Sequence, residues 1–146
     1  GYRGHGNKNI KYHGSFDPDE LPGILNGDFG LVWDGNSENT CSGNNGEYLR
    51  YNDPHKTSLY LAAGIPVITW KYAAIADFIT DSRAGITIEN LYEIPKYINK
   101  LTDKEYNELK YNASRIGEKI RNGYFLNRAL TEILRKISFE NWIYKT

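Results

Sequence analysis

The residues best suited to chemistry stand together between Tyr51 and Ser58, just ahead of an apolar helical stretch. Pro54 favours an extended residue before it and a helix directly after it, so the first N–H groups of that helix lack intrahelical acceptors. The helix dipole makes this end positive, and Lys56 adds a full charge. With the Thr57 and Ser58 hydroxyls, the turn would hold a phosphate or diphosphate. The alternative is an ordinary helix start with a solvated lysine.

Three other side chains are weaker candidates. His13 would face a cleft at the end of a short strand, although a single histidine is more often structural. Asp34 follows a buried apolar run, where it would either bind sugar hydroxyls or cap a turn. Cys41 lies in a Gly/Asn-rich loop with no histidine close by in sequence, so we expect no nucleophile, internal disulfide or zinc site there. No catalytic residue is assigned.

Alternating strands and helices must position these residues. Apolar runs between turn residues predict strands, and capping residues followed by helical spacing predict helices. The expected strands are 9–14, 28–34, 65–70 and 85–88; the expected helices are 18–26, 56–63, 72–80, 91–100, 102–122 and 124–137, with a long polar loop over 35–54. This alternation predicts an α/β layer structure with a parallel sheet, whose ligands bind beyond the carboxyl ends of the strands.

Composition and charge limit the classes of function. The 146 residues suffice for one domain, and 18 Lys+Arg balance 18 Asp+Glu. Residues 12–49 carry seven acids and no Lys or Arg, and the basic residues after Pro95 are mixed with acids along helices. With a net charge of zero, we therefore expect no nucleic-acid partner. No apolar run is long enough for a membrane span and no secretory leader opens the sequence, which predicts a cytoplasmic chain. Because the sequence begins with Gly and has no Met, we expect a fragment or a processed chain.

A resemblance to a known family rests on several separate segments. Residues 56–68 have the form Lys-x-x-x-Tyr-Leu-Ala-Ala-Gly-x-Pro-Val-Ile, which resembles the carboxy-terminal, nucleotide-sugar-binding domain of GT-B glycosyltransferases. More closely, the chain resembles bacterial glucosyl- and galactofuranosyltransferases, including those that extend glycans on serine-rich adhesins. This similarity extends over about residues 9–135, and its further segments are Gly14-Ser15-Phe16, 29–33, 51–58 and 73–79.

The resemblance implies a fold and a set of binding residues. The fold is α/β, a Rossmann-like parallel sheet with helices on both faces that forms one half of a GT-B fold, with a helical C-terminal segment. Residues 1–8 would be a linker or a cloning remnant, 9–137 the nucleotide-sugar-binding domain, and 138–146 a segment that contacts a missing N-terminal domain or packs on its own domain. The implied UDP-sugar-binding residues are Phe16, Tyr51, Asn52, His55, Lys56, Thr57 and Ser58.

One position departs from the family pattern. Many GT-B enzymes have a Glu that binds the ribose where this sequence has Leu59, and a leucine cannot accept that hydrogen bond. Ribose recognition must then come from other residues, or the pocket is arranged differently.

By the same resemblance, the chain is the donor-binding half of a hexosyltransferase that transfers glucose or galactofuranose to a glycan acceptor. The missing N-terminal domain would bind the acceptor, so this fragment alone is expected to be inactive. The UDP-sugar is a substrate, and we expect neither a cofactor nor an essential metal. The sequence leaves open whether the chain forms a homo-oligomer. The rival interpretation is a non-catalytic Rossmann-like or flavodoxin-like module that binds a nucleotide or a protein.

Overall fold

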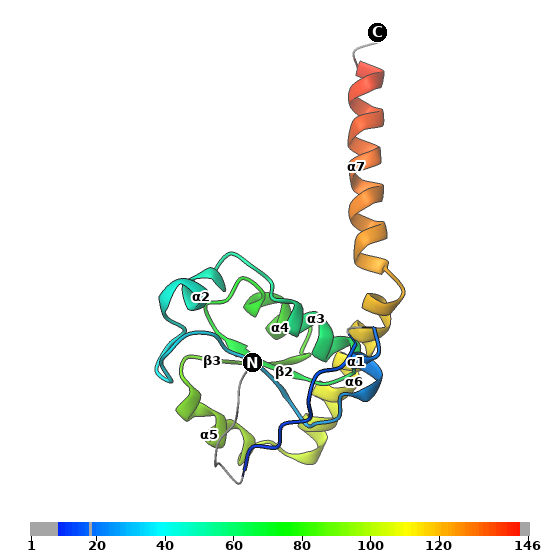
Figure 1. Ribbon diagram of the computed structural model, residues 1–146. Helices are drawn as coiled ribbons and strands as arrows, with labels where there is room; N and C mark the ends of the chain where they lie inside the picture. Colours follow the sequence, from blue (N-terminus) through cyan, green and yellow to red (C-terminus); the bar gives the residue numbers. More distant parts are fainter. Residues whose placement is uncertain (1–8, 18, 144–146) are drawn as a thin grey trace.

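Three parallel strands form the centre of the fold (Figure 1). The computed structural model describes residues 9–17 and 19–143, with only the backbone for 138–143. The strands are β1 (Gly30–Val32), β2 (Val67–Trp70) and β3 (Gly85–Ile88), in the spatial order β1-β2-β3. Gly30 pairs with Val67, which in turn pairs with Gly85. All four residues of β2 are buried, as a continuous apolar run predicts for a central parallel strand.

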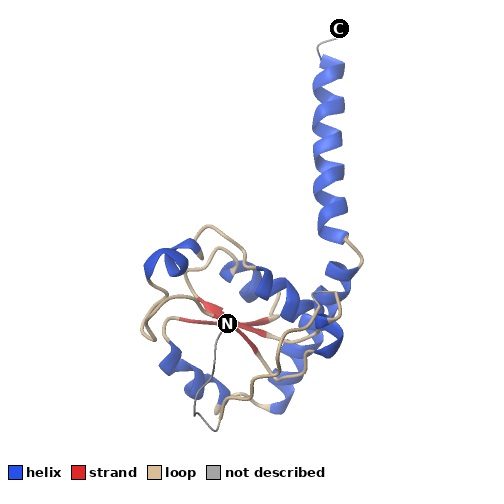
Figure 2. Cartoon of the chain, in the orientation of Figure 1, coloured by secondary structure: helices blue, strands red, loops and turns tan. Residues whose placement is uncertain are grey.

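Helices lie on both sides of this sheet, which confirms the predicted fold class (Figure 2). In Figure 1, α3 and α4 lie on one side and α5 on the other. The helices are α1 (Leu21–Ile24), α2 (Gly43–Tyr48), α3 (His55–Ala62), α4 (Ala76–Asp81), η1 (Leu91–Glu93), α5 (Ile94–Ile98), α6 (Asp103–Arg121) and α7 (Tyr124–Ile143). No helix among the described residues has the length and apolar character needed to span a bilayer.

Local sequence signals determine where the main helices begin and how closely they pack. The capping box predicted for α6 is present: the Glu105 N–H donates to Thr102 Oγ1, and the Thr102 N–H donates to Glu105 Oε2. α3 ends before Gly64, whose φ of 71° favours glycine. α3 packs against α6, and a Cβ at Gly117 would collide with the Leu61 carbonyl oxygen, so Gly117 permits this close approach.

Two buried clusters hold the elements together. The larger one joins β1, β2, α3, α4 and α6 through Val32, Leu61, Val67, Ile79, Ala84, Ala113 and Ile116. The smaller one lies beneath the loop that follows β1 and contains Cys41, Leu49, Trp70 and Ala73. The first cluster stabilises the sheet and its helices, and the second fixes the loop near the carboxyl ends of the strands.

The structure corrects several local predictions. The strand predicted over residues 9–14 is wrong: this segment has no strand pairing and Ile10 and Tyr12 are exposed, so it buries too little apolar surface to add to the sheet. The predicted helix over 18–26 is the single turn α1. The loop over 35–54 contains α2, and α7 continues beyond residue 137 to Ile143. Residues 1–8, predicted to be a linker, and 144–146 lie outside the described residues.

Candidate functional site

The beginning of α3 and the end of β1 form the candidate site. Lys56 lies in the first turn of α3, and Asp34 lies two residues beyond β1. Lys56 Nζ donates to Asp34 Oδ1 at 3.0 Å, although the two residues are 22 positions apart in the sequence. Both side chains are partly exposed, so the ion pair is accessible to a ligand from solvent. The pair lies at the carboxyl end of the sheet, where parallel α/β folds bind ligands.

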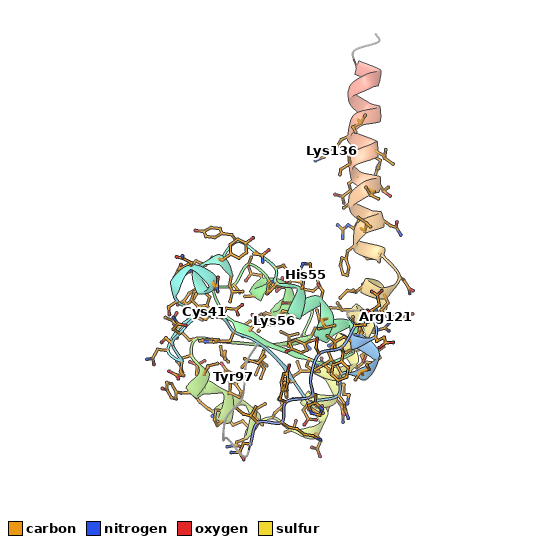
Figure 3. All side chains as sticks on the ribbon, viewed as in Figure 1. Cys41, His55, Lys56, Tyr97, Arg121 and Lys136 are labelled. Carbon is orange, nitrogen blue, oxygen red and sulfur yellow. The ribbon has the colours of Figure 1, made fainter. Side chains whose placement is uncertain are left out.

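The first turn of α3 offers donors beside Lys56. Pro54 is the extended N-cap residue, and the Thr57 N–H donates to its carbonyl at 2.9 Å. The N–H groups of His55 and Lys56 have no acceptor within the described part of the chain. Together with the Lys56 ammonium and the helix dipole, these groups favour an anion. Figure 3 shows His55 and Lys56 as neighbours at this end of α3.

Thr57 and Ser58 lie on another side of α3. Thr57 is 1% exposed, and its Oγ1 has no partner within the described residues. Both residues line a cavity shared with apolar side chains of α4, α6 and the beginning of α7. Successive residues of an α-helix point about 100° apart. The structure therefore directs the Lys56 side chain to the sheet edge and the two hydroxyls to the cavity.

The other predicted residues make no hydrogen bond or ion pair with the Lys56 side chain in the described part of the chain. Tyr51 is 82% exposed, and Asn52 is half-buried. Phe16 is exposed in an irregular segment, because the strand expected to end beside it does not form. The structure thus pairs Lys56 with one carboxylate, Asp34, and leaves the aromatic residues open to solvent.

A profile for the family described as "Glucosyltransferase 3-like, C-terminal domain" matches residues 2–133. This chain belongs to that family. It is 44% identical over 131 residues to the beta-1,6-galactofuranosyltransferase WbbI of Escherichia coli (strain K12), and the aligned part covers 86% of this chain and 39% of WbbI.

Two relatives carry the name glucosyltransferase 3. The protein from Streptococcus gordonii is 31% identical over 130 residues, which cover 88% of this chain and 38% of that protein. The protein from Streptococcus parasanguinis is 31% identical over 120 residues, which cover 81% of this chain and 34% of that protein. The chain therefore spans less than two fifths of the length of each of these curated relatives.

Sequence reasoning missed a charged and aromatic cluster in this family member, at the ends of β2 and β3. The Arg50 guanidinium lies 4.5 Å from the centre of the Trp70 ring, and the Tyr72 ring packs edge-on against Trp70. Lys71 Nζ lies 2.7 Å from Glu89 Oε1, which also accepts from the Tyr72 hydroxyl at 3.0 Å. The signal in the sequence was the run Trp-Lys-Tyr, which begins at the last residue of a buried strand.

This cluster shifts the pKa of its exposed charged groups. The Glu89 carboxylate raises the pKa of Lys71, and the Lys71 ammonium lowers the pKa of Glu89. Trp70 is fully buried, and its Nε1 has no partner within the described part of the chain. The cluster fixes Arg50 against the sheet edge through two aromatic rings and an ion pair with Glu47.

The weaker candidates show no reactive arrangement. Cys41 is fully buried, and burial raises the pKa of its thiol, which disfavours the thiolate needed for nucleophilic attack. His13 is exposed in the irregular segment before α1. Within the described ranges, no three His, Cys, Asp or Glu side chains are grouped to hold a metal ion.

Proposed function

We propose that this chain is the nucleotide-sugar-binding part of a GT-B glycosyltransferase, and that the diphosphate of a UDP-sugar binds at Lys56 and the first turn of α3. The observation that carries the proposal is the exposed Lys56 ammonium at the carboxyl end of the sheet, beside two N–H groups that have no acceptor among the described residues. Relatives named as galactofuranosyl- and glucosyltransferases support galactofuranose or glucose as the transferred hexose.

The proposed site acts on the leaving group. Negative charge grows on the diphosphate as the bond to the sugar breaks, and preorganised donors stabilise that charge more in the transition state than in the ground state. Lys56 and the α3 N-terminus supply these donors. The acceptor binds to an N-terminal domain of a longer parent protein, so this chain alone binds the donor and does not transfer the sugar.

Asp34 adjusts the availability of Lys56 in this proposal. Without a ligand, the Asp34 carboxylate neutralises the ammonium and holds it near the sheet edge. A diphosphate carries more negative charge than a carboxylate, so Lys56 exchanges one anionic partner for a stronger one. Asp34 then lies close to the bound phosphates and repels them.

Calorimetric titration with UDP tests the role of Lys56. We expect Lys56→Ala to weaken UDP binding at least tenfold, which equals about 1.4 kcal/mol, because one charge-assisted phosphate contact is lost. Lys110→Ala, the same change on the exposed side of α6, is the matched control and should leave the affinity unchanged. Equal affinities for wild type and Lys56→Ala would contradict the proposed site.

Asp34→Asn tests the exchange of partners. The substitution keeps the shape of the side chain but removes the charge that pairs with Lys56. We expect tighter UDP binding, with the largest gain at low ionic strength because both the ion pair and the repulsion are screened by salt. An affinity that falls on this substitution would mean that Asp34 positions Lys56 instead of competing for it.

A further inference from the structure

Charged side chains of alternating sign stand in a row along the carboxyl edge of the sheet. The register of the parallel strands, continued past their ends, aligns Asp34 with Lys71 and Lys71 with Glu89. The Lys71 N–H still donates to the Ile88 carbonyl at 2.8 Å, so the register of β2 and β3 extends to this level. Lys56 extends the row on the other side, because its ammonium pairs with Asp34. The row therefore runs from the first turn of α3 across all three strands.

Aromatic rings lie at the far end of this row from Lys56. The Tyr72 ring packs edge-on against Trp70, with ring centroids 5.3 Å apart, and the Tyr72 hydroxyl donates to Glu89 Oε1 at 3.0 Å. The Arg50 guanidinium lies 4.5 Å from the centre of the Trp70 ring and 5.4 Å from that of Tyr72. Tyr72 is 46% exposed, so solvent reaches part of its ring. We call this group the edge cluster: Arg50, Trp70, Lys71, Tyr72 and Glu89.

Backbone contacts hold the edge cluster in place. The Ala74 N–H, in the loop after β2, donates to the Leu49 carbonyl at 2.8 Å. Leu49 is buried directly before Arg50, so this bond ties the end of α2 to the loop that carries Tyr72. Figure 1 shows α2 at this end of the sheet. The cluster is thus formed before any ligand arrives, which lowers the entropy lost on binding.

The charges of the edge cluster are balanced, which favours a neutral ligand. Arg50 Nε lies 2.8 Å from Glu47 Oε2, and Lys71 Nζ lies 2.7 Å from Glu89 Oε1. These four side chains are between 38% and 57% exposed. An anion would have to displace a carboxylate from each cation. A ligand with several hydroxyl groups leaves both ion pairs intact, because it can donate to the carboxylates and accept from the cations on their exposed sides.

We propose that the edge cluster binds the neutral hexose at the reacting end of the acceptor glycan. This inference rests on the proposed function, which places the diphosphate at Lys56. Neighbouring strands are about 4.8 Å apart, so Lys71 and Glu89 lie one and two strand spacings beyond Asp34. The donor hexose fills the space next to the diphosphate, and the following sugar ring lies over the edge cluster. Its hydroxyls bond to the ion pairs, and its apolar C–H face packs on the Tyr72 ring. The acceptor is then held between this edge and the upstream domain.

NMR titration of the 146-residue chain with methyl β-D-glucopyranoside tests the site. The glycoside should shift the Trp70 indole N–H signal saturably, with and without UDP. Tyr72→Ala should weaken glycoside binding at least about threefold through loss of the ring contact, whereas Tyr72→Phe keeps the ring and should retain most of the affinity. Tyr111→Ala is the matched control, because Tyr111 is exposed on α6 with Arg115 over its ring but lies outside the edge cluster. No shift of the Trp70 signal in the wild type, or an equal loss in Tyr111→Ala, would overturn the proposal.

The neutral character of the ligand is tested with two further changes. Glucose 6-phosphate, added after UDP has filled the Lys56 site, should bind no more tightly than the methyl glycoside. Tighter binding at the edge cluster would overturn the choice of a neutral sugar. Glu89→Gln keeps the size of an exposed side chain and should weaken glycoside binding, because a neutral amide is a weaker acceptor than a carboxylate. Unchanged binding would exclude Glu89 from the site.

UDP and UDP-glucose distinguish the acceptor from the donor hexose. Tyr72→Ala should leave the affinities for both unchanged, because the donor hexose lies nearer to Lys56. A loss of UDP-glucose affinity with unchanged UDP affinity would assign the edge cluster to the donor hexose and overturn the acceptor assignment. Lys56→Ala should weaken UDP binding without changing glycoside binding. The donor site and the edge cluster can therefore fail in separate titrations.

Discussion

Leu61 in α3 and Leu134 in α7 are the same residue type on helices of one chain, yet 2% of Leu61 and 64% of Leu134 is exposed. Leu61 packs in the cluster that joins the sheet to α3, α4 and α6. α7 packs mainly against α6, at its own base. The apolar residues of the body therefore stabilise the fold by burial, whereas those of α7 remain exposed and contribute little to it.

Helix α3 contributes side chains both to the candidate site and to the cavity at the start of α7. Lys56 points to the sheet edge and pairs with Asp34, while Thr57 and Ser58 line the apolar cavity between α3, α4, α6 and the start of α7. One turn of α3 therefore lines both the proposed donor site and the apolar cavity. Because different side chains serve the two surfaces, substitutions can alter one without the other.

The largest expected difference between the regions comes from shortening the two leucines. Leu61→Ala should lower the free energy of unfolding by about 2–5 kcal/mol, because it leaves a cavity in the main core. Leu134→Ala should change it by less than about 0.5 kcal/mol in the monomer, since an exposed side chain loses little on truncation. Urea denaturation at a concentration that keeps the chain monomeric measures both. Similar losses would mean that α7 packs on the body in solution.

A smaller effect is expected at the contact between α3 and α6. Gly117→Ala places a Cβ against the Leu61 carbonyl oxygen and should destabilise the chain by about 1–3 kcal/mol, the usual range for overpacking. The gain in helix propensity offsets only about 1 kcal/mol. Gly23→Ala in α1 is the matched control, because its Cβ meets nothing within 4 Å. If the two variants are equally stable, α3 and α6 are not tightly packed.

Much of the body could be predicted because its signals are local. The apolar runs that form β2 and β3 lie between turn residues, and the capping box identified the start of α6. α2 was missed because its Gly43–Tyr48 sequence is rich in Gly and Asn and is typical of a loop. It forms because Cys41 and Leu49, on either side of it, are buried in the second cluster. These two residues pack against Trp70 and Ala73, and such contacts between distant segments cannot be read from the local sequence.

The candidate site was predicted in part for the same reason. The position of Lys56 at the start of α3 follows from Pro54 and the helical pattern after it. Its ion pair with Asp34 depends on the parallel pairing of β1 with β2, which brings residues 22 positions apart together. The segment before α1 illustrates the opposite error, because residues 9–14 were predicted to form a short strand for which the described sheet supplies no partner.

The smallest expected effect concerns Asp53, at the border between the two regions. Partial desolvation raises the pKa of its carboxyl group, although the nearby His55 offsets part of the increase. The folded chain therefore holds this proton more tightly than the unfolded chain does, so the associated stability is present below the unfolded pKa and is lost as the pH rises through the folded pKa. Asp53→Asn removes a carboxylate whose charged form is disfavoured by partial desolvation, and the variant should unfold at a higher temperature than the wild type at pH 7.

The same reasoning predicts that this difference disappears at pH 3, where Asp53 is protonated in both states. Thermal unfolding of the wild type and of Asp53→Asn at both pH values measures this difference. An equal difference at pH 3 and at pH 7 would show that the Asp53 carboxylate is not its cause.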